Sequence, residues 1–253
     1  MNYVNPCFQV LDFSLTKVWH CFGNYMNEVD LQTVINMLNA SKTNVIPINT
    51  HKMTNNNARN GLLIGFGGVK YDDLAKSMDL SEKLIMLNIN HQTTAEDAIE
   101  KTLRAYDLTG EKLIKLEVLN EDMETSNNKE LIKAVKKLRQ LKPELILMPL
   151  LHCNYEDAEE LVELGCPLLR VMGSGIGTGK GIIDKEEFKK ICDLNVPVVL
   201  DGGVGSPKDF EEAVNLGAIG CLVNSMLFKS DYTPEEELKN FVIGCQNILH
   251  SYA

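Results

Sequence analysis

The sequence predicts an α/β fold, a single (β/α)8 barrel of the TIM type that spans residues 1–253. Three observations support this fold class. Six short apolar runs from residue 84 onward are each followed by a polar loop and a segment with helical spacing, which indicates a parallel sheet. Two apolar runs upstream raise the count to eight, the number that closes such a barrel. No GxGxxG follows the first expected strand, which argues against an open, doubly wound sheet.

Each expected strand is a short apolar run, and each expected helix has apolar residues at helical spacing. The expected strands are 17–23, 44–49, 84–89, 113–119, 144–150, 167–172, 196–201 and 218–225. The expected helices are 29–41, 71–80, 93–108, 128–141, 154–165, 184–195, 206–217 and 233–252. Residues suited to begin a helix stand at Thr94, Asn154, and Ser206 or Asp209. Gly165 and Gly217 stand where helices should end.

Three segments lie outside this regular pattern. Residues 1–16 can add a short strand segment ahead of the barrel. Residues 53–60 are polar and are expected to form a mobile loop. Residues 61–70 are apolar and glycine-rich, and they fit either an extra strand or a loop. No linker composition divides the chain, so one domain is expected.

Composition and charge exclude several classes of function. The chain of 253 residues is 44% hydrophobic, and its net charge of -10 argues against a surface for nucleic acid or anionic membranes. It has no apolar run of about 18 residues and no basic segment followed by an apolar one at its start, so a cytoplasmic protein is expected. The seven cysteines form no CxxC pair. Most of them are expected to fill the core, and a disulfide framework or a zinc site is not expected.

The strand sequence LIKLEV carries two charges on one face. Side chains alternate along a strand, so Lys115 and Glu117 lie on one side, and Ile114, Leu116 and Val118 lie on the other. In a barrel the apolar side faces the helices, and the charged side faces inward near the C-terminal mouth, where barrel enzymes place their sites. Two interpretations stay open. One is a structural ion pair, and the other is a Schiff-base lysine that attacks a ketone while the carboxylate moves protons.

A glycine-rich loop, MGSGIGTGKGI, follows the strand at 167–172. It is not a Walker A loop, because Ser174 replaces the first required glycine and Gly181 stands where Ser or Thr is required. The backbone N–H groups of such a loop can bind an anion such as phosphate. The alternative is a flexible loop without a ligand.

The last two strands end in polar residues. Asp201 ends the seventh strand, where it is placed for acid/base work, with a helix-capping or turn role as the alternative. Gly202 and Gly203 follow it, and Asn224 and Ser225 end the eighth strand, so the two loops can form the phosphate site common in barrels. These strand ends and the lysine together predict an enzyme that forms an imine with a small phosphorylated keto sugar.

From about Leu84 to the C-terminus, the sequence resembles the bacterial thiazole synthase family of thiamin biosynthesis. IKLEVL resembles the family's (I/V)KLEV strand, whose lysine forms an imine, and GSGIGTGKGI resembles its glycine loop. VPVVLDGGVGSPKDFEEAVNLGAIGCLVNS resembles a family motif nearly position by position. LNINHQTTAEDAIEKTLRAYDL resembles a segment with an asparagine near the strand end, here Asn88. The motifs are long, ordered and correctly spaced.

The resemblance implies a barrel that acts on 1-deoxy-D-xylulose 5-phosphate. Lys115 would form the imine, with Glu117 and Asp201 as acid/base groups. Near the phosphate or sugar would lie Asn88, Gly175, Gly177, Gly202, Gly203, Asn224 and Ser225. Sulfur would come from the C-terminal thiocarboxylate of a small ubiquitin-like carrier protein, and condensation with dehydroglycine would give the thiazole phosphate of thiamin. The resemblance also implies a homodimer or homotetramer and no metal or cofactor.

Several positions depart from the family pattern, and the chain ends at SYA where family members continue with a tail that helps to close the site and bind the carrier. The departures are Cys21 and Asn24 in an early GTGKY motif, His51-Lys52 for an Arg-Arg pair, Leu87 for a proline, His91 for a glycine, and a missing proline before Ile176.

Three hypotheses therefore stay open. The first is a thiazole synthase. The second is a divergent homologue that installs sulfur on another phosphosugar, which would make it a thiosugar synthase. The third is a non-catalytic barrel that binds a phosphorylated ligand or a carrier protein. The inward lysine argues against the third hypothesis, because a protein that only binds needs no such residue.

Overall fold

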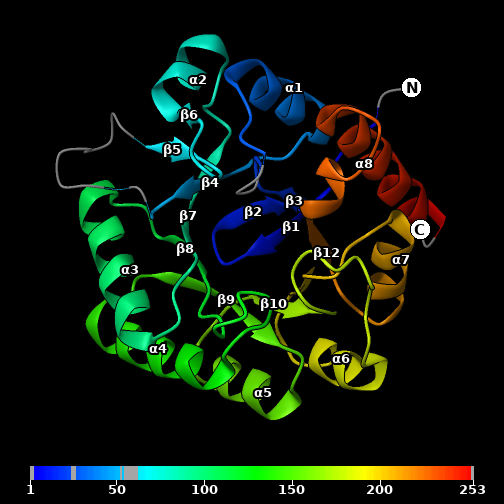
Figure 1. Ribbon diagram of the computed structural model, residues 1–253. Coiled ribbons are helices and arrows are strands. Elements are labelled where there is room, and N and C mark those ends of the chain that lie inside the picture. The colour runs from blue at the N-terminus through cyan, green and yellow to red at the C-terminus, as the bar shows by residue number, and fades with distance from the viewer. Residues whose placement is uncertain (1–2, 24–26, 52, 54–61, 252–253) are drawn as a thin grey trace.

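The computed structural model describes residues 3–23, 27–51, 53 and 62–251. A curled, mostly parallel sheet forms its centre, and helices surround this sheet (Figure 1). The parallel strands are β3 (Val18–His20), β4 (Val45–Asn49), β7 (Leu84–Ile89), β8 (Leu113–Leu116), β9 (Ile146–His152), β10 (Leu169–Met172), β11 (Val198–Asp201) and β12 (Gly220–Val223). The helices are α1 (Leu31–Ser41), α2 (Tyr71–Ser77), α3 (Ala95–Thr109), α4 (Asn128–Leu141), α5 (Tyr155–Glu163), α6 (Lys185–Cys192), α7 (Pro207–Asn215) and α8 (Pro234–Ser251). Their alternation confirms the predicted fold class.

Neighbouring strands follow the chain order around the ring. From β4 the parallel pairing runs through β7, β8, β9, β10, β11 and β12 to β3. Lys115 on β8 is in register with Asn88 on β7 and with Met148 on β9. The carboxyl ends of these strands therefore meet at one mouth, where the predicted site residues gather.

The ring has a seam between β3 and β4, because no ladder joins these two strands within the described ranges. Near the mouth, a hairpin of β5 (Leu63–Ile64) and β6 (Val69–Lys70) fills the seam. β5 pairs with β4 in the antiparallel sense, and the N–H of Phe66 donates to the carbonyl of Phe22 at 3.4 Å. The stretch 61–70 thus contains an extra hairpin from residue 62 onward. Residue 61 and most of the expected polar loop, 54–60, lie outside the described residues.

At the opposite end of the seam, side chains replace the missing backbone pairing. The Asn5 Nδ2 donates to the carbonyls of Val18 (2.9 Å) and Ser41 (3.0 Å). Asn44 acts similarly, accepting from the Thr16 N–H at 3.0 Å. Because buried backbone groups need partners, these asparagines satisfy part of what a ladder would otherwise satisfy.

Two apolar layers hold the barrel together. The outward faces of the strands pack against the helices, and Ile114, Leu116 and Val118 lie in this layer as predicted. The inward faces enclose a second cluster. The N-terminal hairpin of β1 (Cys7–Val10) and β2 (Phe13–Thr16) enters this cluster at the end of the barrel opposite the mouth, with Phe8, Val10 and Leu15 as its buried side chains (Figure 1). Each fully buried side chain of this kind contributes roughly 1.5–3 kcal/mol to folding.

Local sequence signals explain the helix boundaries. Thr94 and Asn154 accept the N–H of the residue three positions on, and Ser206 forms a capping box with Asp209. Gly165 and Gly217 follow helices α5 and α7 with φ of 80° and 108°, which glycine adopts without strain. These predicted starts and stops are confirmed.

The cysteines are free, and four of them are buried: Cys21, Cys166, Cys221 and Cys245. Most of the cysteines thus fill the core as expected, whereas Cys7 is exposed. It lies on a hairpin strand whose alternate residues face away from the barrel. Across the described ranges, no helix combines the length and apolar character that crossing a membrane requires.

Candidate active site

Four charged side chains meet inside the barrel below its mouth. Lys115 forms an ion pair with Glu117. Arg170 on β10 reaches Glu117 and Asp201 at 2.6 Å each, and its Nη1 lies 3.3 Å from the carbonyl of Met148. All four charged groups are buried, and Arg170 is completely so. Two cations and two anions sum to zero, which is the condition under which a buried charge cluster is tolerated.

The alternation of the strands explains this convergence. β8, β10 and β11 each send an apolar side chain outward and a charged one inward, so Lys115, Arg170 and Asp201 point into the same space. Glu117 lies just beyond the end of β8, but its N–H still donates to the carbonyl of Ile89 at 2.9 Å. That bond keeps the strand direction and holds the carboxylate beside the lysine.

Arg170 is the member of the candidate site that the sequence reasoning missed. It stands in PLLRVM, an apolar strand with a single charge, which is the same signal that singled out Lys115 in LIKLEV. Its register partners are Leu150 on β9 and Val199 on β11, so the guanidinium lies between Glu117 and Asp201. Reading every strand for an inward charge would have found it.

The cluster controls the ionisation of its members. Burial alone raises the pKa of the Glu117 carboxyl, but the charges of Lys115 and Arg170 outweigh burial and lower this pKa to about 2 from 4.5. Burial lowers the pKa of the Arg170 guanidinium, while Asp201 and Glu117 outweigh that effect and raise it. Glu117 is therefore a carboxylate at neutral pH, and Arg170 is a permanent cation.

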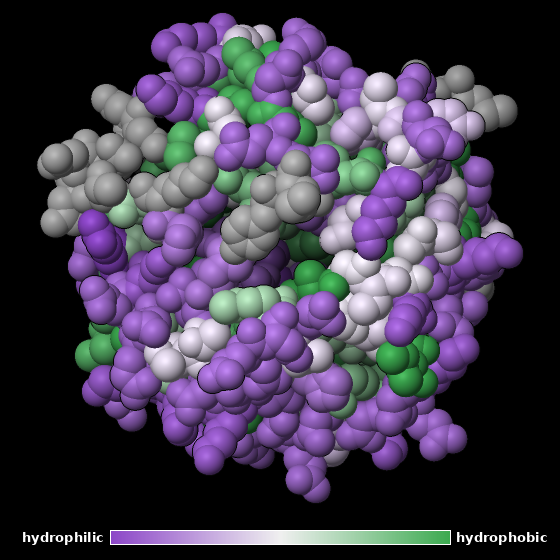
Figure 2. Space-filling model, viewed as in Figure 1, coloured by the Kyte–Doolittle hydropathy of each residue, from purple (hydrophilic) through white to green (hydrophobic). Residues whose placement is uncertain are grey.

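A cavity of about 310 Å³ opens above the cluster. Figure 2 views this face of the molecule and shows a hollow near its centre. Among the predicted site residues, those that line the cavity are Asn88, Lys115, Glu117, Gly177, Asp201, Gly202, Gly203, Asn224 and Ser225. Gly175 does not line it. Gly175 lies beside Thr178 and accepts that hydroxyl at 2.8 Å, so its contact is within the loop.

The glycine loops need glycine for reasons of space as well as backbone conformation. Gly203 has φ of 86°, and a Cβ there would come within 2.9 Å of the Ser174 N and 2.7 Å of the Gly181 carbonyl. The two loops after β10 and β11 thus touch each other, and the Gly181 N–H donates to the Gly203 carbonyl at 2.8 Å. This contact forms one wall of the cavity from bare backbone.

The polar residues of the other strand ends take distinct positions. The Asn88 Oδ1 accepts from the Lys115 Nζ at 3.3 Å. The Asn224 Nδ2 donates to the Gly23 carbonyl at 3.0 Å. Ser225 begins a short 3-10 helix, η2 (Ser225–Phe228), beside Gly177. The cavity therefore has an amide beside the lysine at one end and backbone, amide and hydroxyl groups at the other.

Two of the departures from the family pattern, Cys21 and His91, line this cavity. Leu87 faces the helices, and Gly175, which stands where the family has a proline before Ile176, does not line the cavity. Burial raises the pKa of the Cys21 thiol to about 11, so this cysteine stays protonated at neutral pH. His51 stacks edge-on against His91 with ring centroids 5.8 Å apart. Asn24 and Lys52 lie outside the described residues.

A loop after β8 partly covers the cavity, which the sequence did not predict. Its residues Leu119, Asp122, Met123 and Glu124 line the opening. The Glu124 carbonyl accepts the N–H of Ile176 at 2.9 Å, so the loop is joined to the glycine loop across the mouth. The described ranges hold no cluster of three or more His, Cys, Asp or Glu side chains arranged to bind a metal ion.

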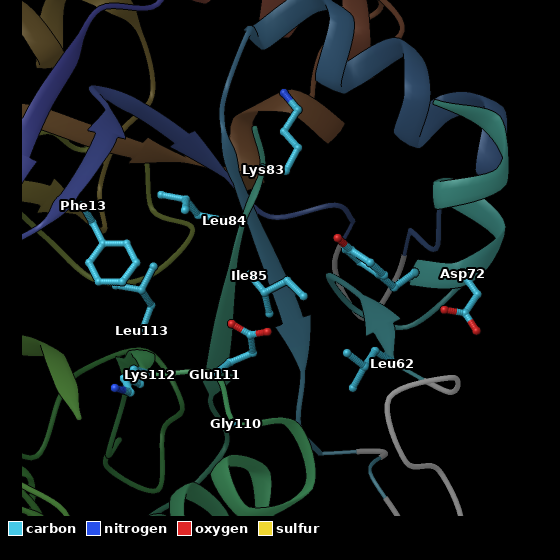
Figure 3. A pocket seen from close by; sticks show the side chains of 11 residues that line it. Phe13, Leu62, Asp72, Lys83, Leu84, Ile85, Gly110, Glu111, Lys112 and Leu113 are labelled. Atoms are coloured by element: carbon cyan, nitrogen blue, oxygen red, sulfur yellow. The ribbon is translucent and has the colours of Figure 1, made fainter. Parts of the chain in front are cut away.

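A larger cavity of about 680 Å³ lies at the opposite end of the barrel. Figure 3 shows its lining side chains at the amino ends of β7 and β8, among them Phe13, Lys83 and Lys112. The Lys83 Nζ donates to the Thr43 carbonyl at 2.5 Å, so this lysine has a structural partner. No predicted site residue lines this cavity.

Comparisons with known proteins agree with this geometry. The model of the family described as thiazole biosynthesis protein ThiG matches residues 23–235. A thiazole synthase of Clostridium perfringens (strain SM101) is 29% identical over 164 residues, which cover 64% of this chain and 63% of that protein. A thiazole synthase of Acetivibrio thermocellus is 32% identical over 146 residues, 57% of this chain and 56% of that protein. The chain thus spans less than two thirds of these relatives.

A solved structure shares nearly the whole fold. The crystal structure of the Amycolatopsis orientalis BexX/CysO complex superposes with a TM-score of 0.82 at 25% identity, covering 98% of this chain and 96% of that chain. The family match covers most of the chain and includes the strands that carry Lys115, Glu117, Arg170 and Asp201. The chain therefore belongs to the ThiG family of thiazole biosynthesis proteins.

Proposed function

We propose that this protein is a thiazole synthase-type enzyme in which Lys115 forms an imine with the ketone of a phosphorylated ketose. 1-deoxy-D-xylulose 5-phosphate is the ketose that the family resemblance implies, and the alternative is another phosphosugar. The observation that carries the proposal is the position of Lys115, buried between Asn88 and Glu117 at the base of a cavity. A lysine there can attack a carbonyl that enters from the mouth.

The charge balance of the cluster favours the reaction. The ammonium and the ketone combine to a protonated imine and water, so the two hydrogens that nitrogen loses leave with the carbonyl oxygen. The nitrogen carries one positive charge before and after this step. The neutral sum over Lys115, Glu117, Arg170 and Asp201 is therefore kept, and the buried site pays no new desolvation cost. Glu117 would be protonated only transiently while it transfers a proton, and Asp201 would be the second acid/base group.

The phosphate is proposed to bind at the loops after β10 to β12. Gly177, Gly202, Gly203, Asn224 and Ser225 lie there. Their backbone N–H, amide and hydroxyl groups suit a phosphate, and η2 begins at the same place. The carbon chain of the ketose would then extend from these loops to Lys115, with Asn88 beside the reacting nitrogen.

The later steps are proposed from family membership. Sulfur would come from the C-terminal thiocarboxylate of a small ubiquitin-like carrier protein, and dehydroglycine would complete the thiazole. The solved neighbour is itself a complex, which supports a protein partner for this fold. A carrier tail would reach the cavity through the mouth, past the loop that bears Asp122 and Met123. We also propose a homodimer or homotetramer.

The decisive experiment is reductive trapping. The protein is incubated with 1-deoxy-D-xylulose 5-phosphate or a hexulose phosphate and reduced with borohydride, and the intact mass is measured. We expect a sugar adduct on the wild type and none on Lys115→Ala or Lys115→Arg. The arginine variant keeps the positive charge beside Glu117, so loss of its adduct reports chemistry and not a disturbed cluster.

Lys112→Ala is the matched control, because Lys112 lies just before the same strand but lines the cavity at the other end. It should give the wild-type adduct. An adduct that survives in both Lys115 variants would refute the imine. The absence of any adduct on the wild type with either ketose phosphate would refute it as well.

A further inference from the structure

The cavity has a polar end that the proposed imine does not use. β7 is next to β8, and the glycine loops follow β10 and β11 on the far side of the ring. This step relies on the proposed function: a sugar with its phosphate at those loops and its carbonyl at Lys115 turns its remaining carbon, C1, towards β7. The side chains at the end of β7 therefore meet whatever C1 carries.

Asn90 is the side chain at this end whose hydrogen bonding is incomplete. It is 4% exposed and lines the cavity. Its Nδ2 lies 3.4 Å from the His91 Nε2, whereas its Oδ1 has no hydrogen-bond partner in the described part of the chain. A buried acceptor left unpaired destabilises the site, because it has lost its hydrogen bonds to water without replacement. A ligand that brings a donor to Asn90 recovers this energy, and a ligand without one does not.

His91 adds a second polar group beside Asn90. It has φ of 62°, a conformation in which glycine is the usual residue, so the backbone is strained at this position. Its ring lies 6.2 Å from that of Phe66, and both side chains line the cavity. The end of the cavity near β7 thus has two polar side chains on its wall, Asn90 and His91.

We propose that Asn90 selects ketose phosphates that carry a hydroxymethyl group at C1 over the 1-deoxy sugar. A hydroxyl on C1 can donate to the free Oδ1 of Asn90, whereas the methyl of a 1-deoxy ketose would leave this acceptor buried and unpaired. The substrate class of the site is then a fully hydroxylated ketose phosphate. Asn90 is a specificity-determining residue, and it takes no part in forming the imine.

The test uses two ligands that differ by one oxygen. D-xylulose 5-phosphate and 1-deoxy-D-xylulose 5-phosphate are titrated into the full-length protein by calorimetry, and parallel samples are trapped with borohydride. We expect the hydroxylated sugar to bind about tenfold more tightly to the wild type. In Asn90→Leu, which is nearly isosteric, and in Asn90→Ala, the ratio of the two dissociation constants should fall to about one.

Asn224→Leu is the matched control, since Asn224 lines the other end of the same cavity. It should weaken both sugars and keep their ratio. A wild-type ratio near one, a preference for the 1-deoxy sugar, a ratio that both Asn90 variants leave unchanged, or binding of neither sugar overturns this proposal. Selective binding without a trapped adduct would instead refute the imine at Lys115 and leave the role of Asn90 supported.

Discussion

The two ends of the barrel hold two cavities of opposite character. The cavity at the amino ends of the strands is the larger, at about 680 Å³, yet its lysines face solvent or a backbone carbonyl (Figure 3). The cavity at the carboxyl ends is about 310 Å³ and lies over four buried charges. The proposed function assigns the chemistry to the smaller cavity, so the criterion that selects it is the burial of paired charges below an opening and not volume. Buried charge clusters are where the reactivity of titratable groups is most strongly altered.

The largest effect should come from removing the shared cation. In Arg170→Met, Glu117 and Asp201 lose their common partner inside the barrel. The free energy of unfolding, measured by urea denaturation, should fall by about 3–5 kcal/mol. Lys83→Met, at the other cavity, removes one hydrogen bond of a half-buried lysine and should cost about 1 kcal/mol. Equal losses in the two variants would mean that the two ends do not differ in this way.

The loss of folding stability at low pH distinguishes His20, on the helix-facing side of the sheet, from the charge cluster inside the barrel. Burial lowers the pKa of His20 from 6.5 to about 3, and the His20 Nε2 lies 2.9 Å from the Ser41 Oγ on the helix-facing side of β3. The unfolded chain binds a proton on this histidine below pH 6.5 while the folded chain stays neutral, so stability falls as the pH drops from 6.5 towards 3. His20→Gln should remove a few kcal/mol of this loss. Urea denaturation at a series of pH values measures it.

Glu117 acts in a lower window of pH. Its pKa is depressed to about 2, so the stability it contributes is complete above pH 4.5 and is lost as the pH falls towards 2. The variant His20→Gln should therefore keep the loss below pH 4.5. If His20→Gln kept its full stability from pH 4.5 down to pH 2, the charge cluster would not contribute to acid unfolding.

The smallest effect compares two glycines, one at each cavity. Gly203 and Gly110 have φ of 86° and 74°, so alanine is strained at both. A Cβ on Gly203 would also meet the loop after β10, whereas one on Gly110 would meet nothing within 4 Å. Gly203→Ala should lower the free energy of unfolding by about 2 kcal/mol or more, and Gly110→Ala by about 1 kcal/mol. Thermal unfolding of the two variants side by side checks this difference.

The strand pattern was enough to predict the barrel and to place three of the four charges. LIKLEV has two charges in an apolar run, so its inward face could be read directly, and Asp201 was found by its place at a strand end. Arg170 is the single charge in the run PLLRVM, so its inward position could also have been read from the strand, but its two partners are far away in sequence. A pairing across 31 and 53 positions follows from strand register, which local patterns do not specify.

The hairpin in the seam could not be predicted for a related reason. β5 and β6 have two residues each, so neither provides enough alternation to reveal a strand. β5 pairs with the edge of β4 that β3 leaves unpaired at the seam. This free edge is a property of the assembled ring and cannot be read from the local sequence. The loop over the mouth, which bears Met123 at φ of 57°, is likewise joined to another loop through the N–H of Ile176, a contact between segments that are distant in sequence.

The N-terminal hairpin has a consequence for the order of events at the site. Phe8, Val10 and Leu15 pack into the far end of the barrel, so among the described residues the charge cluster is reached from the mouth. Under the proposed function, sugar, sulfur donor and product would all pass through this mouth. A donor protein bound there would trap a ligand that had already entered and exclude one that had not. We therefore expect compulsory-order kinetics, with the ketose first to arrive and the product unable to leave before the donor protein.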